Sequence, residues 1–256
     1  MRPPLLEVDL GPGVQAAFTM AVAPEGSGGR PAAASPHGDF NLGLGLGEED
    51  AVVLARREGL ADWLGVPVVT ARQVHGTHVH PVPAAPQDPT EVPTADGLVT
   101  TSTEVGLVVL AADCVPVLLC DPHHGVAAAV HAGRAGVVGD VVGRAVAAMV
   151  GRGAQVTDLR AVVGPAVCGS CYEVPAELAA QVVAAVPETR SRTRRGTAAL
   201  DLPAGVGAQL FAAGVRQVCH LGSCTLEDPR WYSHRGVPQG RPAGRHGGVV
   251  RLLRAS

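Results

Sequence analysis

The sequence predicts a single domain of the mixed α/β or α+β class, spanning residues 1–256, and three observations support this. The chain has 256 residues, 46% of them hydrophobic, which is enough to bury a substantial core. Short apolar runs rich in β-branched residues alternate with segments of helical periodicity, although not as strict βαβ repeats. No internal repeat is visible along the chain.

The first half of the chain contains one predicted loop, one helix and three strands. Residues 21–49 are rich in Gly, Pro, Ala and Ser and have no periodicity, which predicts a long loop. Residues 50–65 predict a helix that begins at an acidic residue and ends at Gly65. Apolar runs rich in β-branched residues predict buried strands over 105–113, 115–121 and 125–133.

The second half continues this alternation. An apolar stripe at helical spacing predicts a helix over 136–150, and residues 159–167 predict a strand. Residues 175–186 predict a helix with Pro175 at its first position. The remaining predictions are an exposed basic loop over 190–196, a strand over 215–224, and a tail over 236–256 that starts as a loop and closes with a short strand.

Composition excludes several classes of function. The chain has no apolar run of 18 residues and no secretory signal pattern, so we expect a cytoplasmic protein that does not contact membranes. A net charge of −3 without a basic run argues against nucleic acid as a partner. All 20 basic residues are arginine, so phosphate must be held by arginine or by backbone N–H groups. Without a signal, the six cysteines are expected to be reduced.

Three segments place a metal-binding side chain where a predicted strand meets a turn flanked by Gly or Pro. They contain His75 in Gln-Val-His-Gly, Cys114 in Ala-Asp-Cys-Val-Pro, and His131 in Val-His-Ala-Gly. One cysteine with two histidines suits Zn²⁺ and leaves the fourth coordination position open, as in catalytic sites. Taken singly each signal is weak, because a histidine at a strand end is usually an ordinary polar residue.

His75 is also the first residue of a His-x-x-His-x-His pattern, whose other histidines are His78 and His80. Multicopper oxidases use such spacing, but the His-Cys-His motif that they also need is missing, since Val218 precedes Cys219. Residues two apart share a face of a strand, so we expect His78 and His80 to lie together and His75 to point elsewhere.

Five ordered motifs extend this set: QVHG, ADCVPVLLCD, AVHAG, VGPAVCGSCYEV and CTLEDPRWYSHR. In order and spacing they resemble the bacterial YfiH-like laccase-domain family, over about Phe18 to Arg245. Its members are described as multicopper polyphenol oxidase-like proteins and as purine nucleoside phosphorylases. The resemblance implies a layered sandwich of mixed sheets and helices, with a zinc site formed by His75, Cys114 and His131. It also implies phosphorolysis of adenosine, inosine or methylthioadenosine, with some adenosine deamination.

Further site residues follow from these motifs. We expect Arg235 and Arg134 to hold phosphate, because the guanidinium fork suits bidentate phosphate contacts. Arg134 and Ala135 stand where the family commonly has Trp-Arg. Asp113 is either a proton carrier, a residue that orients a metal ligand, or an ordinary capping residue. Gln73 and Tyr172 are expected to contact the nucleoside.

Several alternatives remain open. Cys114 with His131 or His75 as base would make a thiol hydrolase, for example an amidase that edits peptidoglycan precursors. Cu²⁺ bound adventitiously in the zinc site would give weak polyphenol oxidation. A zinc-stabilised binding module would need a fourth protein ligand. A zinc deaminase of the cytidine type is excluded, because the chain has no His-x-Glu. Cys168 and Cys171 are then either pocket-lining residues or an incidental thiol pair, and we expect a structural role for at least one of them.

Overall fold

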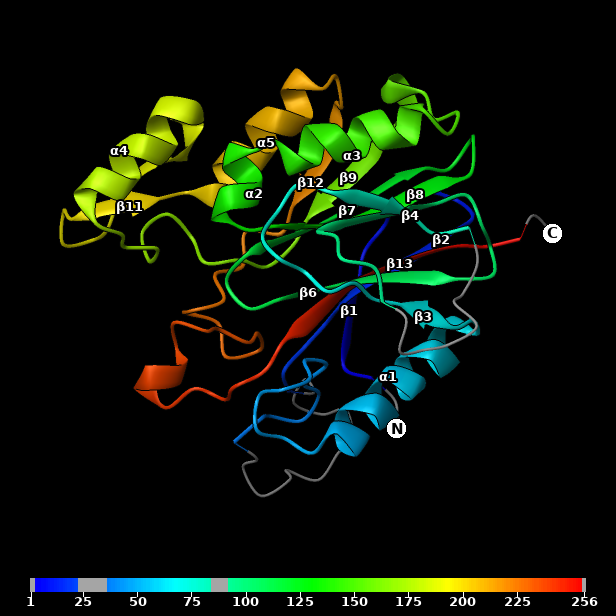
Figure 1. The fold of residues 1–256 in the computed structure, drawn as a ribbon, viewed down its shortest axis with the longest axis horizontal. Coiled ribbons are helices and arrows are strands. Elements are labelled where there is room, and N and C mark those ends of the chain that lie inside the picture. The colour runs from blue at the N-terminus through cyan, green and yellow to red at the C-terminus, as the bar shows by residue number, and fades with distance from the viewer. Residues whose placement is uncertain (1–2, 23–35, 84–91, 255–256) are drawn as a thin grey trace.

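The computed structural model describes residues 3–22, 36–83 and 92–254, and in it two sheets are packed face to face between helices (Figure 1). The six-stranded sheet has the order β12 (Gln217–His220), β9 (Arg160–Val163), β7 (Val115–Asp121), β8 (Val126–Ala132), β5 (Gly97–Thr100), β4 (Val79–Pro81). The five-stranded sheet has the order β1 (Leu5–Glu7), β2 (Val14–Thr19), β13 (His246–Leu252), β6 (Gly106–Ala111), β3 (Val68–Val69).

Helices cover the outer faces of both sheets. α2 (Arg134–Val138), α3 (Val141–Val150) and α5 (Leu202–Ala212) lie over the six-stranded sheet (Figure 1). α4 (Ala176–Ala185) lies beside them, over a hairpin of β10 (Arg190–Arg192) and β11 (Ala198–Leu200). α1 (Asp50–Leu64) covers the five-stranded sheet from the other side. The result is a four-layer α–β–β–α sandwich, which confirms the predicted mixed fold class.

Strand periodicity decides which residues face which layer. In β7, Val117 and Leu119 pack against the helices, whereas Leu118 and Cys120 pack between the two sheets. Cys114 lies one residue before β7, and if the alternation of the strand continues to it, its side chain is on the same side as Leu118 and Cys120. His131 follows Ala127 and Ala129 on the corresponding side of β8. The side chains of Cys114 and His131 are therefore expected on the same face of the six-stranded sheet.

Most predicted elements are confirmed. The helix predicted over 50–65 is α1, and it ends at Gly65, whose φ of 73° is the left-handed conformation that favours glycine. The strands predicted in the centre of the chain are β6, β7, β8 and β9, and those nearer the C-terminus are β12 and β13. β13 is longer than expected and central, because it pairs with both β2 and β6.

The structure corrects two predictions and adds elements that periodicity did not show. The helix predicted over 136–150 is divided into α2 and α3, because Asp140 leaves the helical conformation with a φ of 59° and accepts the N–H of Gly143 at 3.1 Å. The basic loop predicted over 190–196 instead begins with β10, which pairs with β11. α5 escaped prediction because it contains two glycines and a proline and no clear stripe.

The long loop predicted over 21–49 lies partly outside the described residues. Residues 21–22 and 36–49, which the structure describes, contain no helix or strand until α1 begins at Asp50. Among the described residues, no helix combines the length and the apolar character that crossing a membrane requires.

Asp121 closes the turn between β7 and β8 and provides a test of this part of the fold. Its buried carboxylate accepts the N–H groups of His123, His124 and Gln155 at 2.8–3.0 Å. Burial alone would raise the pKa of Asp121, but the hydrogen bonds from Gln155 and His124 outweigh it and lower the pKa.

We expect Asp121→Ala to lower the free energy of unfolding at pH 7 by about 1.5 to 3 kcal/mol, because three backbone N–H groups lose a charged acceptor. Since folding lowers this pKa, the stabilisation is complete above the unfolded value of about 3.9 and is lost as pH falls through the folded value. Denaturant unfolding measured from pH 7 to pH 3 should show the two proteins converging in acid. Asp158→Ala, at the exposed carboxylate beside His124, is the control; equal losses in both variants would contradict the assignment.

Candidate metal centre

His75, Cys114 and His131 come together although they lie far apart in the sequence. One ligand atom from each lies within 4.8 Å of the others. The two imidazole rings have centroids 5.0 Å apart at an interplanar angle of 75°, so they meet edge to face. The three residues predicted from separate motifs therefore form one cluster.

Strand pairing brings two of the three together. In the antiparallel register of β7 and β8, Val115 lies opposite Ala132 and Pro116 opposite His131. Cys114 and Gly133 extend this ladder by one step. A Cβ atom at Gly133 would lie 2.5 Å from Cδ2 of His75 and 3.3 Å from Sγ of Cys114, so only glycine permits this close packing.

Asp96 holds the third residue in place. Its buried carboxylate accepts the backbone N–H groups of Val74, His75 and Gly76 at 2.7–3.1 Å. The same carboxylate lies 2.9 Å from Nδ1 of His131. Asp96 directly precedes β5, and its carbonyl accepts the N–H of His131 at 2.7 Å. One side chain thus fixes the loop that carries His75 and the ring of His131.

The backbone is strained at two residues of this site. His75 has a φ of 59° and Asp113 a φ of 86°, conformations that side chains other than glycine rarely adopt. Such strain costs about 1 to 3 kcal/mol per residue and persists only where surrounding contacts impose it. For His75 the contacts are the three N–H bonds to Asp96. For Asp113, its carboxylate accepts hydrogen bonds from Thr225 and Arg235, and its carbonyl accepts the N–H of Val167.

The charges of the cluster depend on one another. Burial would raise the pKa of Asp96, but hydrogen bonds from His131 and from the N–H groups of Gly76 and Val74 lower it overall. Burial would also raise the pKa of Cys114, yet hydrogen bonds to His131 and His75 bring it down to about 6. Burial disfavours the protonated ring of His131, but Asp96 and Cys114 raise its pKa to about 9.

The donor set fits a metal ion of borderline softness. Asp96 occupies Nδ1 of His131, which leaves Nε2 as the ring atom available to a cation. Cys114 offers a sulfur that ionises readily, and His75 adds a second imidazole. Two imidazoles with one thiolate suit Zn²⁺ and also Cu²⁺.

Asp113 and Arg235 belong to a neighbouring network. One carboxylate oxygen of Asp113 accepts the hydroxyl of Thr225 at 2.7 Å, and the other accepts the N–H of Arg235 at 2.8 Å. The guanidinium of Arg235 lies 4.4 Å from the ring centroid of Tyr172. The structure therefore links these three predicted site residues to one another, with Asp113 next to Cys114 in the chain.

The other predicted substrate residues are placed differently. Both ends of the Gln73 side-chain amide bond to the backbone of Leu110, at 2.7 and 2.8 Å, so this side chain ties its segment to β6. Arg134 is the first residue of α2, directly after Gly133. His78 and His80 lie together with ring centroids 6.2 Å apart, as the strand periodicity predicted.

Sequence reasoning missed Asp96 and Arg245. Asp96 stands in Thr-Ala-Asp-Gly, which looks like an ordinary turn, so no motif signalled its role. Arg245 directly precedes β13 and is half-buried; burial lowers the pKa of its guanidinium, while the nearby charges of Cys114 and Asp113 raise it. Only the register of β13 brings this arginine toward the cluster.

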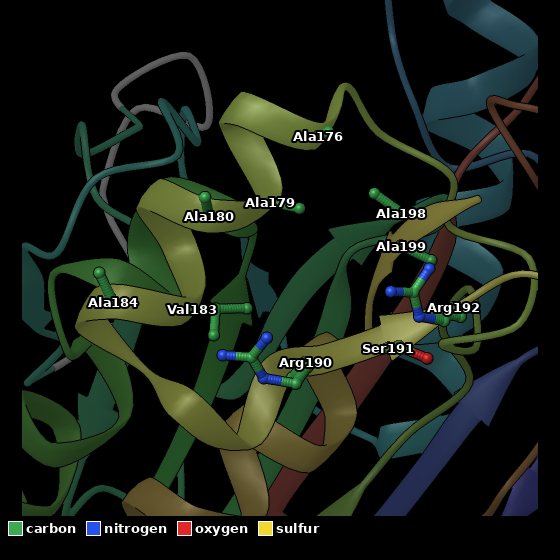
Figure 2. Close-up of a pocket in the computed structure, with 10 residues that line it drawn as sticks. All are labelled: Ala176, Ala179, Ala180, Val183, Ala184, Arg190, Ser191, Arg192, Ala198 and Ala199. Carbon is green, nitrogen blue, oxygen red and sulfur yellow. The ribbon is translucent and has the colours of Figure 1, made fainter. Parts of the chain in front are cut away.

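A pocket of about 530 Å³ lies elsewhere, between α4 and the β10–β11 hairpin (Figure 2). Alanines and Val183 of the helix line one side, and Arg190, Ser191 and Arg192 line the other (Figure 2). None of the residues that line it belongs to the cluster of His75, Cys114 and His131. We therefore locate the candidate site by its chemistry rather than by this pocket.

Relatives of the chain agree with the family that its motifs resemble. The chain is 46% identical over 222 residues to the purine nucleoside phosphorylase ORF3 of Streptomyces griseus, covering 86% of this chain and 89% of the relative. It is 46% identical over 220 residues to a purine nucleoside phosphorylase of Mycobacterium tuberculosis, covering 85% of this chain and 86% of the relative.

Solved structures show the same fold. A Neisseria meningitidis protein superposes with a TM-score of 0.82 at 27% identity, covering 98% of this chain and all of the other. The Bacillus licheniformis hypothetical protein YfiH superposes with a TM-score of 0.81 at 26% identity, covering 98% of this chain and 97% of the other. Residues 26–253 match the family described as multi-copper polyphenol oxidoreductase laccase. The chain belongs to this laccase-like family.

Proposed function

We propose that the chain is a cytoplasmic, zinc-dependent purine nucleoside phosphorylase that acts on adenosine, inosine and methylthioadenosine, with adenosine deamination as a secondary activity. The observation that carries this proposal is the cluster of His75, Cys114 and His131, positioned by Asp96. The names of the relatives from Streptomyces griseus and Mycobacterium tuberculosis support the reaction class.

His75, Cys114 and His131 would hold the zinc ion, with Asp96 orienting His131. When bound, zinc supplies a Lewis acid that stabilises negative charge beside it and lowers the pKa of bound water. The carboxylate of Asp96 would accept a hydrogen bond from Nδ1–H of His131, which leaves the Nε2 lone pair for the cluster. Gly133 leaves space for His75 to approach Cys114.

In phosphorolysis, a phosphate oxygen forms a bond to C1′ of the ribose while the bond from C1′ to the purine nitrogen breaks. The electron pair of that bond leaves with the purine, which then takes a proton. The site must therefore hold a phosphate dianion close to a ribosyl centre that becomes positive. With no lysine in the chain, guanidinium groups must supply most of the positive charge.

Arg235, Arg134 and Arg245 are the arginines that we assign to phosphate and to the departing purine. Arg235 is pre-oriented on the face of Tyr172, which would also offer the nucleoside a flat surface to stack on. Arg134 directly follows Gly133 in the motif that contains His131, and the charge of Cys114 raises the pKa of Arg245 against the effect of burial. Gln73 would act from the wall of the site, held there by Leu110.

We assign Asp113 a positioning role instead of proton transfer. Both of its carboxylate oxygens already accept hydrogen bonds, from Thr225 and from the N–H of Arg235. Its negative charge thus fixes the segment that presents Arg235, and its backbone leads directly into Cys114.

A thiol hydrolase, such as an amidase acting on cell-wall precursors, is the second candidate. The observation that favours it is the position of Cys114 within 4.8 Å of ring nitrogens of His75 and His131, because a thiol beside an imidazole base can act as a nucleophile. The pKa of Cys114, which His131 and His75 lower to about 6, agrees with this arrangement. Iodoacetamide separates the two: Cys114 should resist alkylation in zinc-loaded protein and react after chelation. Rapid alkylation in the zinc-loaded enzyme would favour the hydrolase.

The reaction itself is tested by incubating zinc-loaded protein with adenosine, inosine or methylthioadenosine, with and without phosphate. We expect release of free purine base together with ribose 1-phosphate, or its methylthio derivative, only when phosphate is present. Slow ammonia release from adenosine in both conditions would report the deaminase activity. If no purine nucleoside releases base in a phosphate-dependent manner, the phosphorylase assignment is wrong.

Asp96→Asn tests the positioning of the metal ligands. Asparagine keeps the size of the side chain, but its amide places an N–H group against donors that need an acceptor. We expect the affinity for one equivalent of zinc per chain to fall about 10- to 100-fold, as measured by competition with a chelator. Asp158→Asn, whose carboxylate also faces a histidine ring, is the matched control. Unchanged zinc affinity in folded Asp96→Asn protein would contradict the role of Asp96.

A further inference from the structure

A second cluster of metal-binding side chains lies outside the candidate metal centre. One ligand atom each from Cys168, Cys171, Cys224 and Glu227 lies within 4.8 Å of the others. Four ligands held at about 2.3 Å around a tetrahedral cation would be separated by about 3.8 Å. The cluster therefore needs only a small contraction to surround an ion.

Two similar turns build this cluster. Cys168 and Cys171 are three residues apart, and the N–H of Cys171 donates to the carbonyl of Cys168 at 2.9 Å. Cys224 and Glu227 have the same spacing, and the N–H of Glu227 donates to the carbonyl of Cys224 at 3.2 Å. Each turn thus presents two ligands from one side, as Cys-x-x-Cys segments do in structural zinc sites.

The two turns are joined directly to each other. Ala166 and Cys224 form a parallel bridge, and the N–H of Thr225 donates to the carbonyl of Ala166 at 3.0 Å. The N–H of Cys168 points at the sulfur of Cys224, with a separation of 3.4 Å. Burial raises the pKa of Cys224, although the N–H of Cys168 favours its thiolate form.

The three sulfurs lie close enough for their charges to influence one another. Burial would raise the pKa of Cys168, but hydrogen bonds from Ser170 and from Cys224 and Cys171 lower it. Burial, the hydrogen bond to Cys168 and the charges of Cys224 and Cys168 raise the pKa of Cys171 to about 12. The positive charge of a bound divalent cation would offset this repulsion, so that the coordinating thiols are deprotonated.

We propose that Cys168, Cys171, Cys224 and Glu227 form a structural site for a soft divalent cation, with Zn²⁺ as the ion that fits best. Three thiolates with one carboxylate suit zinc and do not suit Mg²⁺ or Ca²⁺. Glu227 forms an ion pair with Arg194, an exposed partner that it can exchange for the metal.

This site would fix the wall of the candidate metal centre. Val167, next to Cys168, donates its N–H to the carbonyl of Asp113 at 3.0 Å. Thr225, next to Cys224, donates its hydroxyl to the carboxylate of Asp113. Tyr172, next to Cys171, stacks with Arg235. A cation that binds the two turns therefore holds in place the residues around Asp113, next to Cys114. It shares no ligand with the candidate metal centre.

Metal counting on the full-length chain, purified with reductant and without air, tests the proposal without any activity assay. We expect wild-type protein to retain two equivalents of zinc after removal of free metal. Cys114→Ser should retain one equivalent, bound at the second site, and Cys224→Ser should retain one equivalent, bound at the candidate metal centre. Cys219→Ser, which changes an exposed cysteine outside both clusters, is the control and should retain two. One equivalent in wild type with none in Cys114→Ser would overturn the second site.

Cobalt titration keeps the test valid if a cysteine variant fails to fold. In Cys114→Ser, Co²⁺ should still produce strong thiolate-to-cobalt charge-transfer absorption, because three sulfurs remain at the second site. Glu227→Gln should keep that absorption but bind more weakly, whereas Arg194→Ala should not weaken binding. Absence of sulfur ligation in Cys114→Ser would overturn the proposal. So would a Cys168–Cys171 disulfide in protein kept under reducing conditions, because it would identify a redox pair instead.

Discussion

The candidate metal centre depends on the carboxylate of Asp96. It accepts three consecutive backbone N–H groups from the loop of His75 and also faces the ring of His131. Without that anion, His75 would lose the contacts that hold it at a positive φ, and His131 would lose the partner that sets its tautomer. One buried negative charge thus organises two side chains that come from different parts of the chain.

The four-layer sandwich explains why this cluster can form at all. β7 and β8 align Cys114 with His131, and the alternation of side chains turns both toward the layer between the sheets. β13 carries Arg245 into the same region from the end of the chain. The second cluster, at Cys168 and Cys224, ties together the turns on the other side of Asp113. We infer that the fold supplies the rigid frame and that its loops supply the chemistry.

The sequence predicted the parts of this arrangement that depend on local chemistry. α1 followed from its acidic start and the glycine that ends it, and the central strands followed from apolar runs rich in β-branched residues. His75, Cys114 and His131 followed from their position at strand ends beside glycine or proline. The role of Asp96 could not be predicted, because it depends on a hydrogen bond to His131, which lies on a strand later in the chain. The Cys168–Cys224 cluster was missed for the same reason, since a parallel bridge at Ala166 creates it. α5 was missed because it contains two glycines and a proline and has no clear apolar stripe, and β10 was missed because it contains no apolar residue.

The position of zinc in crystals of the loaded protein tests the central claim most directly. An anomalous difference map recorded at the zinc edge should show a peak about 2.0–2.3 Å from a ring nitrogen of His75, Sγ of Cys114 and Nε2 of His131. Nδ1 of His131 should remain on Asp96, and the fourth coordination position should be free of protein atoms. A peak at Sγ of Cys114 that lacks His75, or one completed there by a fourth protein ligand, would contradict the account.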